Sequence, residues 1–151
     1  NLLPLILVGG AGWKDHAIQQ AIAQAEQAGH VRWLSYVDTP DLPALYALCD
    51  AFLMPSIYEG FGMPVLEAQL CGAPVVHGHH ASMCEAGAQL GIAVGTSTAE
   101  LQHMLRDLSA GTLPLKCRLP TDFHHSVQWA AETMWQQFQA AVRSSPSVAA
   151  A

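Results

Sequence analysis

The sequence predicts an α/β fold in which a Rossmann-like parallel sheet carries helices on both faces. Short apolar runs alternate along the chain with longer segments whose apolar residues recur at helical spacing. The apolar runs are nearly unbroken, as in residues 2–8, which is typical of parallel strands that are buried on both faces. Parallel strands need long crossover connections, so this alternation favours one parallel sheet.

The first strand, residues 2–8, leads into a glycine-rich loop. Gly10 and Gly12 fit the first two positions of the dinucleotide-binding fingerprint G-x-G-x-x-G, but Asp15 stands where the third glycine belongs. We therefore reject NAD binding and expect Asp15 to cap a helix that ends at Gly29. Further strands are predicted at residues 31–37, 51–55, 75–77 and 91–95.

Residues 55–68 are the stretch with the clearest chemistry, because a strand leads there through a glycine-rich turn into a helix. Pro64 suits the first helical position, and Gly72 can end the helix in a left-handed conformation. Free N–H groups and the helix dipole make such a helix start an anion site. Gly60 and Gly62 would let the backbone approach a ligand closely, because they lack a Cβ atom.

Two carboxylates bracket this predicted anion site. Glu59 lies in the loop before the helix, and Glu67 lies about one turn inside it. A carboxylate repels phosphate but accepts hydrogen bonds from sugar hydroxyls. The spacing therefore suggests a ligand that has both parts, namely a sugar nucleotide.

The segment from Glu59 to Glu67, with Gly-Phe-Gly-Met-Pro inside it, resembles the E-x7-E signature of retaining glycosyltransferases of family 4. The flanking residues 55–56 and 71–76 also fit that family, whose members have the two-domain GT-B architecture. The resemblance runs from about residue 5 to about residue 95 and covers the C-terminal, donor-binding half of such an enzyme. It implies transfer of a sugar, with retention, from a nucleotide-diphospho-sugar donor.

The resemblance implies a role for each residue of this segment. Glu59, the catalytic candidate, would contact the donor sugar, and Glu67 would accept hydrogen bonds from the ribose hydroxyls. The plain alternative for both glutamates is a favourable interaction with the helix dipole. The backbone N–H groups that face the diphosphate or the sugar would come from Gly60, Phe61, Gly62 and Met63.

Tyr36 and Val37 close the second predicted strand. By resemblance, they occupy the place from which the main chain of the family contacts the nucleotide base. Ordinary strand packing is an equally good interpretation of these two residues, because main-chain contacts leave little trace in the side chains.

Three histidines, His77, His79 and His80, follow the fourth strand at the carboxyl end of the predicted sheet, where ligands bind in such folds. No acidic or cysteine partner is spaced to complete a metal site, so we predict no bound metal. We expect the histidines to line the donor pocket or to face solvent, with His80 and Glu85 as the pocket candidates. Capping of a helix N-terminus is the alternative for Glu85.

Ser97 and Glu100 have the spacing of a capping box and predict the start of another helix. A final helix with an apolar face is predicted over residues 127–142. We expect residues 1–143 to form the donor-binding domain and residues 144–151 to form a flexible tail.

Composition restricts the class of protein and its partners. The chain has 151 residues, 51% of them hydrophobic and 12% charged, which is enough for one domain with a core. The net charge of −6 argues against binding to nucleic acid or to anionic membranes. No apolar run is long enough to cross a bilayer, and the four cysteines form no C-x-x-C pair. We therefore expect a cytoplasmic protein with reduced thiols, peripheral to the inner membrane at most.

The resemblance implies that the donor domain begins one strand and one helix earlier, in a segment whose arginine and lysine neutralise the donor diphosphate. That strand is central to the sheet of the family, and its absence would expose the backbone groups of two strands. We therefore expect residues 1–143 to be an N-terminally incomplete donor domain without transferase activity of its own. The acceptor, a glycan or a lipid-linked glycan, would bind to the N-terminal domain of the full-length protein.

The overall resemblance suggests polysaccharide assembly with a mannose-type donor, GDP- or UDP-linked, and no further cofactor. Two other classes of function stay open. The chain would be a non-catalytic nucleotide-binding fragment or relic if the basic pair is absent from the full-length protein. A sugar-nucleotide epimerase of the same fold would share the glycine-rich turn, although the E-x7-E context favours transfer.

Overall fold

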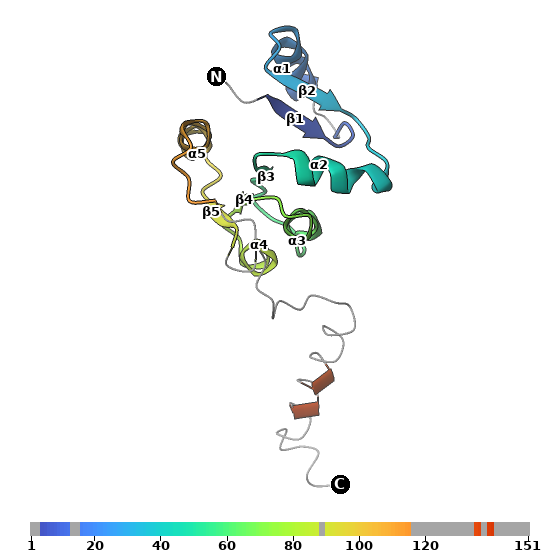
Figure 1. Ribbon diagram of the computed structural model, residues 1–151, viewed down its shortest axis with the longest axis vertical. Helices are drawn as coiled ribbons and strands as arrows, with labels where there is room; N and C mark the ends of the chain where they lie inside the picture. The colour runs from blue at the N-terminus through green and yellow to red at the C-terminus, as the bar shows by residue number, and fades with distance from the viewer. Residues whose placement is uncertain (1–3, 13–15, 88–89, 116–134, 137–138, 141–151) are drawn as a thin grey trace. The chain divides into compact units, whose positions relative to one another are not determined.

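The computed structural model describes residues 4–12, 16–87, 90–115, 135–136 and 139–140 (Figure 1). The chain separates into two compact units, residues 1–119 and 120–151. All the helices and strands named below lie in the first unit. Asp15 and most of the predicted final helix lie outside the described residues.

Strands and helices alternate along the first unit in the predicted order. The elements are β1 (Leu5–Val8), α1 (His16–Gln27), β2 (Val31–Leu34), the 3-10 turn η1 (Thr39–Asp41), α2 (Leu42–Leu48), β3 (Phe52–Met54), α3 (Met63–Leu70), β4 (Val75–Gly78), α4 (Ala81–Ala86), β5 (Ile92–Val94) and α5 (Thr98–Ala110). All five predicted strands are present, although most are shorter than predicted. The second strand ends at Leu34 rather than at residue 37.

Every strand pair in the described region is parallel, which confirms the predicted fold class. β1 pairs with β2 from Leu5 opposite Val31 onward. β4 pairs on one side with β3 and on the other with β5, so it is the central strand of a second sheet in the order β3-β4-β5. The single sheet that the sequence predicts is therefore divided into a two-stranded and a three-stranded sheet over the described residues.

The core of the described region is built on the three-stranded sheet. All four residues of β4 are buried, His77 among them. β1 is apolar throughout, yet its residues Ile6 and Val8 are 43% and 48% exposed. The buried apolar cluster comes from α3, β4, α4 and the turn before β4, and consists of Val65, Ala68, Ala73, Val75, Met83 and Ala86.

The capping box at the start of α5 is present as predicted. The Glu100 backbone N–H donates to Ser97 Oγ at 3.3 Å, and the Ser97 backbone N–H donates to the Glu100 carboxylate at 3.2 Å. The hydrogen bonds from the Ser97 side chain and backbone lower the pKa of Glu100. The helix ends at Gly111, which takes the left-handed conformation with φ of 69°.

The two glycines of the turn before α3 have different environments. Gly62 has φ of 87°, and a Cβ atom there would lie 2.6 Å from Met83 Sδ of α4. A Cβ at Gly60 would meet no atom within 4 Å. The missing side chain of Gly62 therefore makes room for α4, and the approach of a ligand to the backbone of both glycines stays a prediction.

We expect Gly62→Ala to lower the free energy of unfolding by at least about 2 kcal/mol, because it adds left-handed strain to a steric overlap with Met83. The matched variant Gly60→Ala should cost less than about 0.5 kcal/mol. Urea denaturation of both variants measures the difference. Equal losses in the two variants would contradict the packing role of Gly62.

Candidate functional site

The start of α3, where the sequence predicts an anion site, follows the glycine-rich turn. The helix begins at Met63, with Gly62 as its N-cap, so Pro64 is its second residue rather than its first. The Val65 backbone N–H donates to the Gly62 carbonyl at 2.9 Å, and Pro64 has no N–H. A helix start leaves its first backbone N–H groups without a partner inside the helix. Here these groups are the N–H groups of Gly62 and Met63. The partly buried side chain of Phe61 packs against the buried cluster.

Glu67 lies one turn inside α3 and is half-buried. The Tyr46 hydroxyl of α2 donates to Glu67 Oε2 at 3.1 Å, and the Tyr46 ring meets the Phe52 ring edge-on with centroids 5.2 Å apart. Burial, and then the charge and hydrogen bond of Glu67, raise the pKa of Tyr46 to about 12. No role is assigned to Tyr46 from the sequence alone. No local signal marks this contact, because its partners are 21 residues apart.

Glu59 is half-buried, and its backbone is tied to the start of α4. Ser82 Oγ donates to the Glu59 carbonyl at 3.1 Å, and His80 Nδ1 lies 2.9 Å from Ser82 Oγ. Because the single hydroxyl hydrogen of Ser82 goes to Glu59, Ser82 Oγ must accept from His80, and Nδ1 of His80 therefore carries a hydrogen. The His80 ring also meets the exposed ring of Tyr58 at 5.1 Å. The structure thus brings the predicted residues Glu59 and His80 together.

Glu85 and the other two histidines have separate environments. Glu85 is exposed and is the fifth of the six residues of α4, so the alternative that it caps the helix N-terminus is wrong. His79 is exposed. His77 is a residue of β4 and only 2% exposed, so the expectation that it lines a pocket or faces solvent is wrong. A Cβ at Gly87 would come within 2.5 Å of the His77 ring, which shows how closely the backbone encloses it.

The described residues contain no group of three histidine, cysteine or acidic side chains that could hold a metal ion. His80 takes part in the contacts of the Glu59 loop, whereas His77 belongs to the core. The three predicted histidines therefore do not act as one cluster.

Tyr36 and Val37 lie in the loop after β2, because that strand ends at Leu34. Tyr36 is 75% exposed, so strand packing is not the explanation for this residue. The contacts around Glu59 and Glu67 come from α2, α3 and α4, whereas Tyr36 and Val37 follow the two-stranded sheet.

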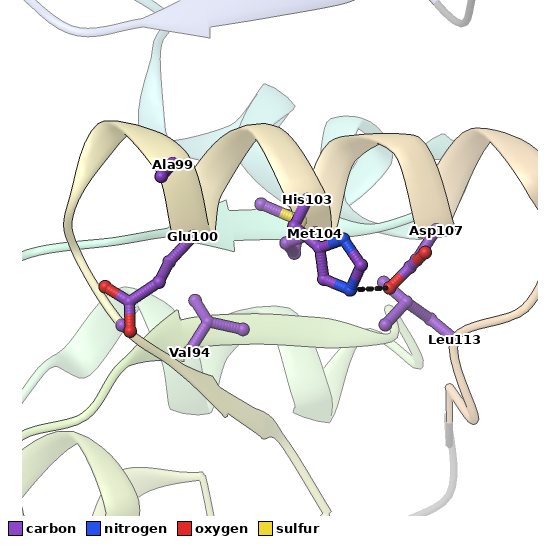
Figure 2. Close-up of a pocket in the computed structure, with 8 residues that line it drawn as sticks. Val94, Ala99, Glu100, His103, Met104, Asp107 and Leu113 are labelled. Carbon is purple, nitrogen blue, oxygen red and sulfur yellow. Dashed lines mark ion pairs between the residues drawn. The ribbon is translucent and has the colours of Figure 1, made fainter.

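A groove of about 480 Å³ lies beside α5, and Figure 2 shows the side chains that line it. Its apolar surface includes Val94 and Met104, and its rim carries an ion pair in which His103 Nε2 lies 3.3 Å from Asp107 Oδ2. None of the predicted site residues lines this groove. The full lining consists of Val94, Gly95, Ala99, Glu100, His103, Met104, Asp107 and Leu113.

Residues 2–100 match the family described as glycosyl transferases group 1. A curated relative, the O-antigen chain mannosyltransferase B of Escherichia coli, is 40% identical over 107 residues, which are 70% of this chain and 28% of the relative. Sucrose-phosphate synthase from Thermosynechococcus elongatus has a similar structure, with a TM-score of 0.60 at 21% identity, over 93% of this chain and 39% of that one. AviGT4, a glycosyltransferase involved in avilamycin A biosynthesis, gives a TM-score of 0.56 at 25% identity, over 74% of this chain and 34% of that one.

The chain thus spans well under half the length of each of these proteins. The likeness to sucrose-phosphate synthase supports the parallel α/β fold alone. In the part of the chain that the structure describes, no helix is both long and apolar enough to pass through a membrane.

The raised pKa of Tyr46 predicts a loss of stability at high pH. Between pH 10.0, the ordinary pKa of the phenol, and about 12, the folded chain keeps the Tyr46 proton and the unfolded chain loses it. The free energy of unfolding should therefore fall as pH rises through this window. Denaturation at a series of pH values should show a smaller fall in Tyr46→Phe, and an identical pH dependence in the two proteins would contradict the raised pKa of Tyr46.

Proposed function

The chain belongs to the glycosyl transferases group 1 family, and from this premise we propose that it is the C-terminal, donor-binding half of a retaining, family 4 transferase with the GT-B architecture. In the full-length protein, this half would bind a nucleotide-diphospho-sugar donor. The sugar would pass, with retention at its anomeric carbon, to an acceptor on the N-terminal domain, and the nucleoside diphosphate would leave. The observation that carries the proposal is the placement of Glu59 and Glu67 on either side of the start of α3.

The backbone around the start of α3 suits the diphosphate. The N–H groups of Gly62 and Met63 lie at the positive end of the helix dipole. Gly60 is exposed and has open space where a Cβ would stand, so a phosphate or a sugar can approach its backbone closely. The backbone of Phe61 belongs to the same turn, and in this proposal it faces the donor as well.

Glu67 is suited to the ribose rather than to the diphosphate. An ionised carboxylate only accepts hydrogen bonds, and ribose hydroxyls donate them. Tyr46 engages one carboxylate oxygen, Oε2, and the carboxylate has further lone pairs for a ligand. Its negative charge also keeps the phosphates toward the helix start, where the N–H groups lie.

Glu59 is the residue that we assign to the donor sugar. A hydrogen bond from Ser82, which is itself bonded to His80, holds the loop of Glu59 against the start of α4. A side chain on a loop held in this way can contact a sugar ring in one orientation. We do not assign it the role of nucleophile, because Glu67 faces the ribose in this proposal and the two carboxylates then do not flank one bond. His80, and Glu85 farther along α4, would complete the sugar pocket.

The nucleotide base would contact the loop after β2. Tyr36 and Val37 lie in that loop rather than in the strand, so their main-chain groups are not used by strand pairing. This supports the family-based assignment of the loop to the base. Whether the base is guanine or uracil is what the titration below determines.

The mannosyltransferase relative supports a mannosyl donor, linked to GDP or UDP, and a role in polysaccharide assembly. The acceptor in this proposal is a glycan or a lipid-linked glycan at the cytoplasmic face of the membrane. It would reach the donor through the N-terminal domain.

The division of the sheet supports an incomplete donor domain. β1 and β3 are edge strands of the two sheets in the described region, and the apolar strand β1 is half-exposed. A strand placed between them would pair both edges. The same observation favours a second candidate function, a nucleotide-binding segment that has no transferase activity of its own.

Titration of the isotopically labelled chain with GDP and UDP, followed by amide NMR, tests the proposal. We expect one diphosphate to shift the amides of Gly60, Met63 and Glu67. Glu67→Gln should weaken this binding by about tenfold, which corresponds to loss of one charge-assisted hydrogen bond. The matched control Asp107→Asn removes one half-buried negative charge outside the site and should leave the binding unchanged. No amide shift with either diphosphate would overturn the proposal.

We expect the chain alone to release no diphosphate from GDP-mannose in the presence of a mannan acceptor. A coupled assay for free GDP measures this. Sustained release that depends on the acceptor would show that residues 1–151 are a complete transferase and would contradict the incomplete domain.

A further inference from the structure

Tyr46 holds the carboxylate of Glu67 by an interaction that sequence reasoning did not foresee. Its hydroxyl donates to Glu67 Oε2 at 3.1 Å across the contact between α2 and α3. Its ring is fixed in turn by the edge-on contact with Phe52 of β3, at an interplanar angle of 86°. The hydroxyl therefore comes from a side chain that packing already immobilises.

This contact limits what Glu67 can do. A glutamate on a helix surface samples several rotamers and loses that freedom when it binds a ligand. The carboxylate of Glu67 is already held by a half-buried donor, so it has lost part of this freedom before a ligand binds and is preorganised. Because the donor is a neutral phenol, Glu67 keeps its negative charge, and Oε1 stays available as an acceptor.

We propose that Tyr46 is a positioning residue for the donor ribose, which fixes Glu67 so that its carboxylate accepts the ribose hydroxyls. The inference rests on the proposed function, since it assumes that Glu67 faces the ribose of a nucleoside diphosphate. It adds a residue on α2 to a proposed site that otherwise comes from α3, α4, the loop before α3 and the loop after β2. Tyr46 itself touches Glu67 and not the ligand.

The plain alternative is that the hydrogen bond only ties α2 to α3. A tether of that kind would change stability and would affect all ligands of the site alike. A positioning role acts through the ribose hydroxyls, so it changes the discrimination between a nucleotide with these hydroxyls and one without them. The two roles therefore differ in a measurable quantity.

The test compares the Kd of GDP or UDP, whichever binds, with the Kd of its 2′-deoxy and 3′-deoxy counterparts. We expect the wild-type chain to prefer the ribose form and Tyr46→Phe to lose about fivefold of that preference, the effect of one hydrogen bond. Tyr46→Phe keeps the ring against Phe52, and circular dichroism and urea denaturation confirm that the variant is folded.

A double-mutant cycle isolates the route through Glu67. In the Glu67→Ala background, Tyr46→Phe should have no further effect on the discrimination between ribose and deoxyribose, because the carboxylate that it positions is gone. Glu67→Asp is a second variant that breaks the contact, because its shorter side chain withdraws the carboxylate from the Tyr46 hydroxyl. It leaves Tyr46 unchanged and should lose the same preference for the ribose form.

Each outcome decides between the hypotheses. Reduced ribose discrimination in Tyr46→Phe, absent in the Glu67→Ala background, supports the positioning role. Binding with unchanged discrimination in Tyr46→Phe overturns the inference and leaves the proposed function standing. A wild-type chain that binds neither diphosphate overturns the proposed function, and the inference with it.

Discussion

The packing of α3 against α4 over β4 is the constraint on which the candidate site depends. Gly62 lies where the two helices meet, in a left-handed conformation that leaves no room for a Cβ beside Met83. Because Gly62 is also the N-cap of α3, this contact fixes where the helix begins and hence where Glu67 comes one turn later. The burial that stabilises the three-stranded sheet therefore also sets the geometry of the proposed diphosphate site.

Uncharged donors from neighbouring elements hold both glutamates of the motif. Tyr46 donates to the carboxylate of Glu67, and Ser82 donates to the main-chain carbonyl of Glu59. A neutral donor fixes a carboxylate without cancelling its charge, which a salt bridge would do. In the proposed function, the charge of Glu67 would attract the hydroxyl hydrogens of the ribose and keep the phosphate oxygens near the helix start.

The sequence was sufficient for the parts of the fold that local patterns determine. Apolar runs predicted all five strands, and the spacing of Ser97 and Glu100 predicted a capping box that is present. Contacts between residues distant in sequence could not be read in this way. The packing of Gly62 on Met83, the bond from Tyr46 to Glu67 and the burial of His77 depend on which helices and strands become neighbours. A glycine that makes room for a helix also looks, in sequence, like one that makes room for a ligand.

The two sheets differ in how completely they bury their strands. Every residue of β1 is apolar, yet Ile6 and Val8 are 43% and 48% exposed, whereas β4 is buried along its whole length although it contains His77. In the proposed function, the diphosphate and ribose contacts belong to the well-packed sheet, whereas the base contacts follow the sheet whose burial is incomplete. The helix-dipole and carboxylate contacts therefore depend on a packed core within this chain. In the proposed function, the choice of base depends on the loop after β2, whose partner strand β1 leaves apolar residues exposed.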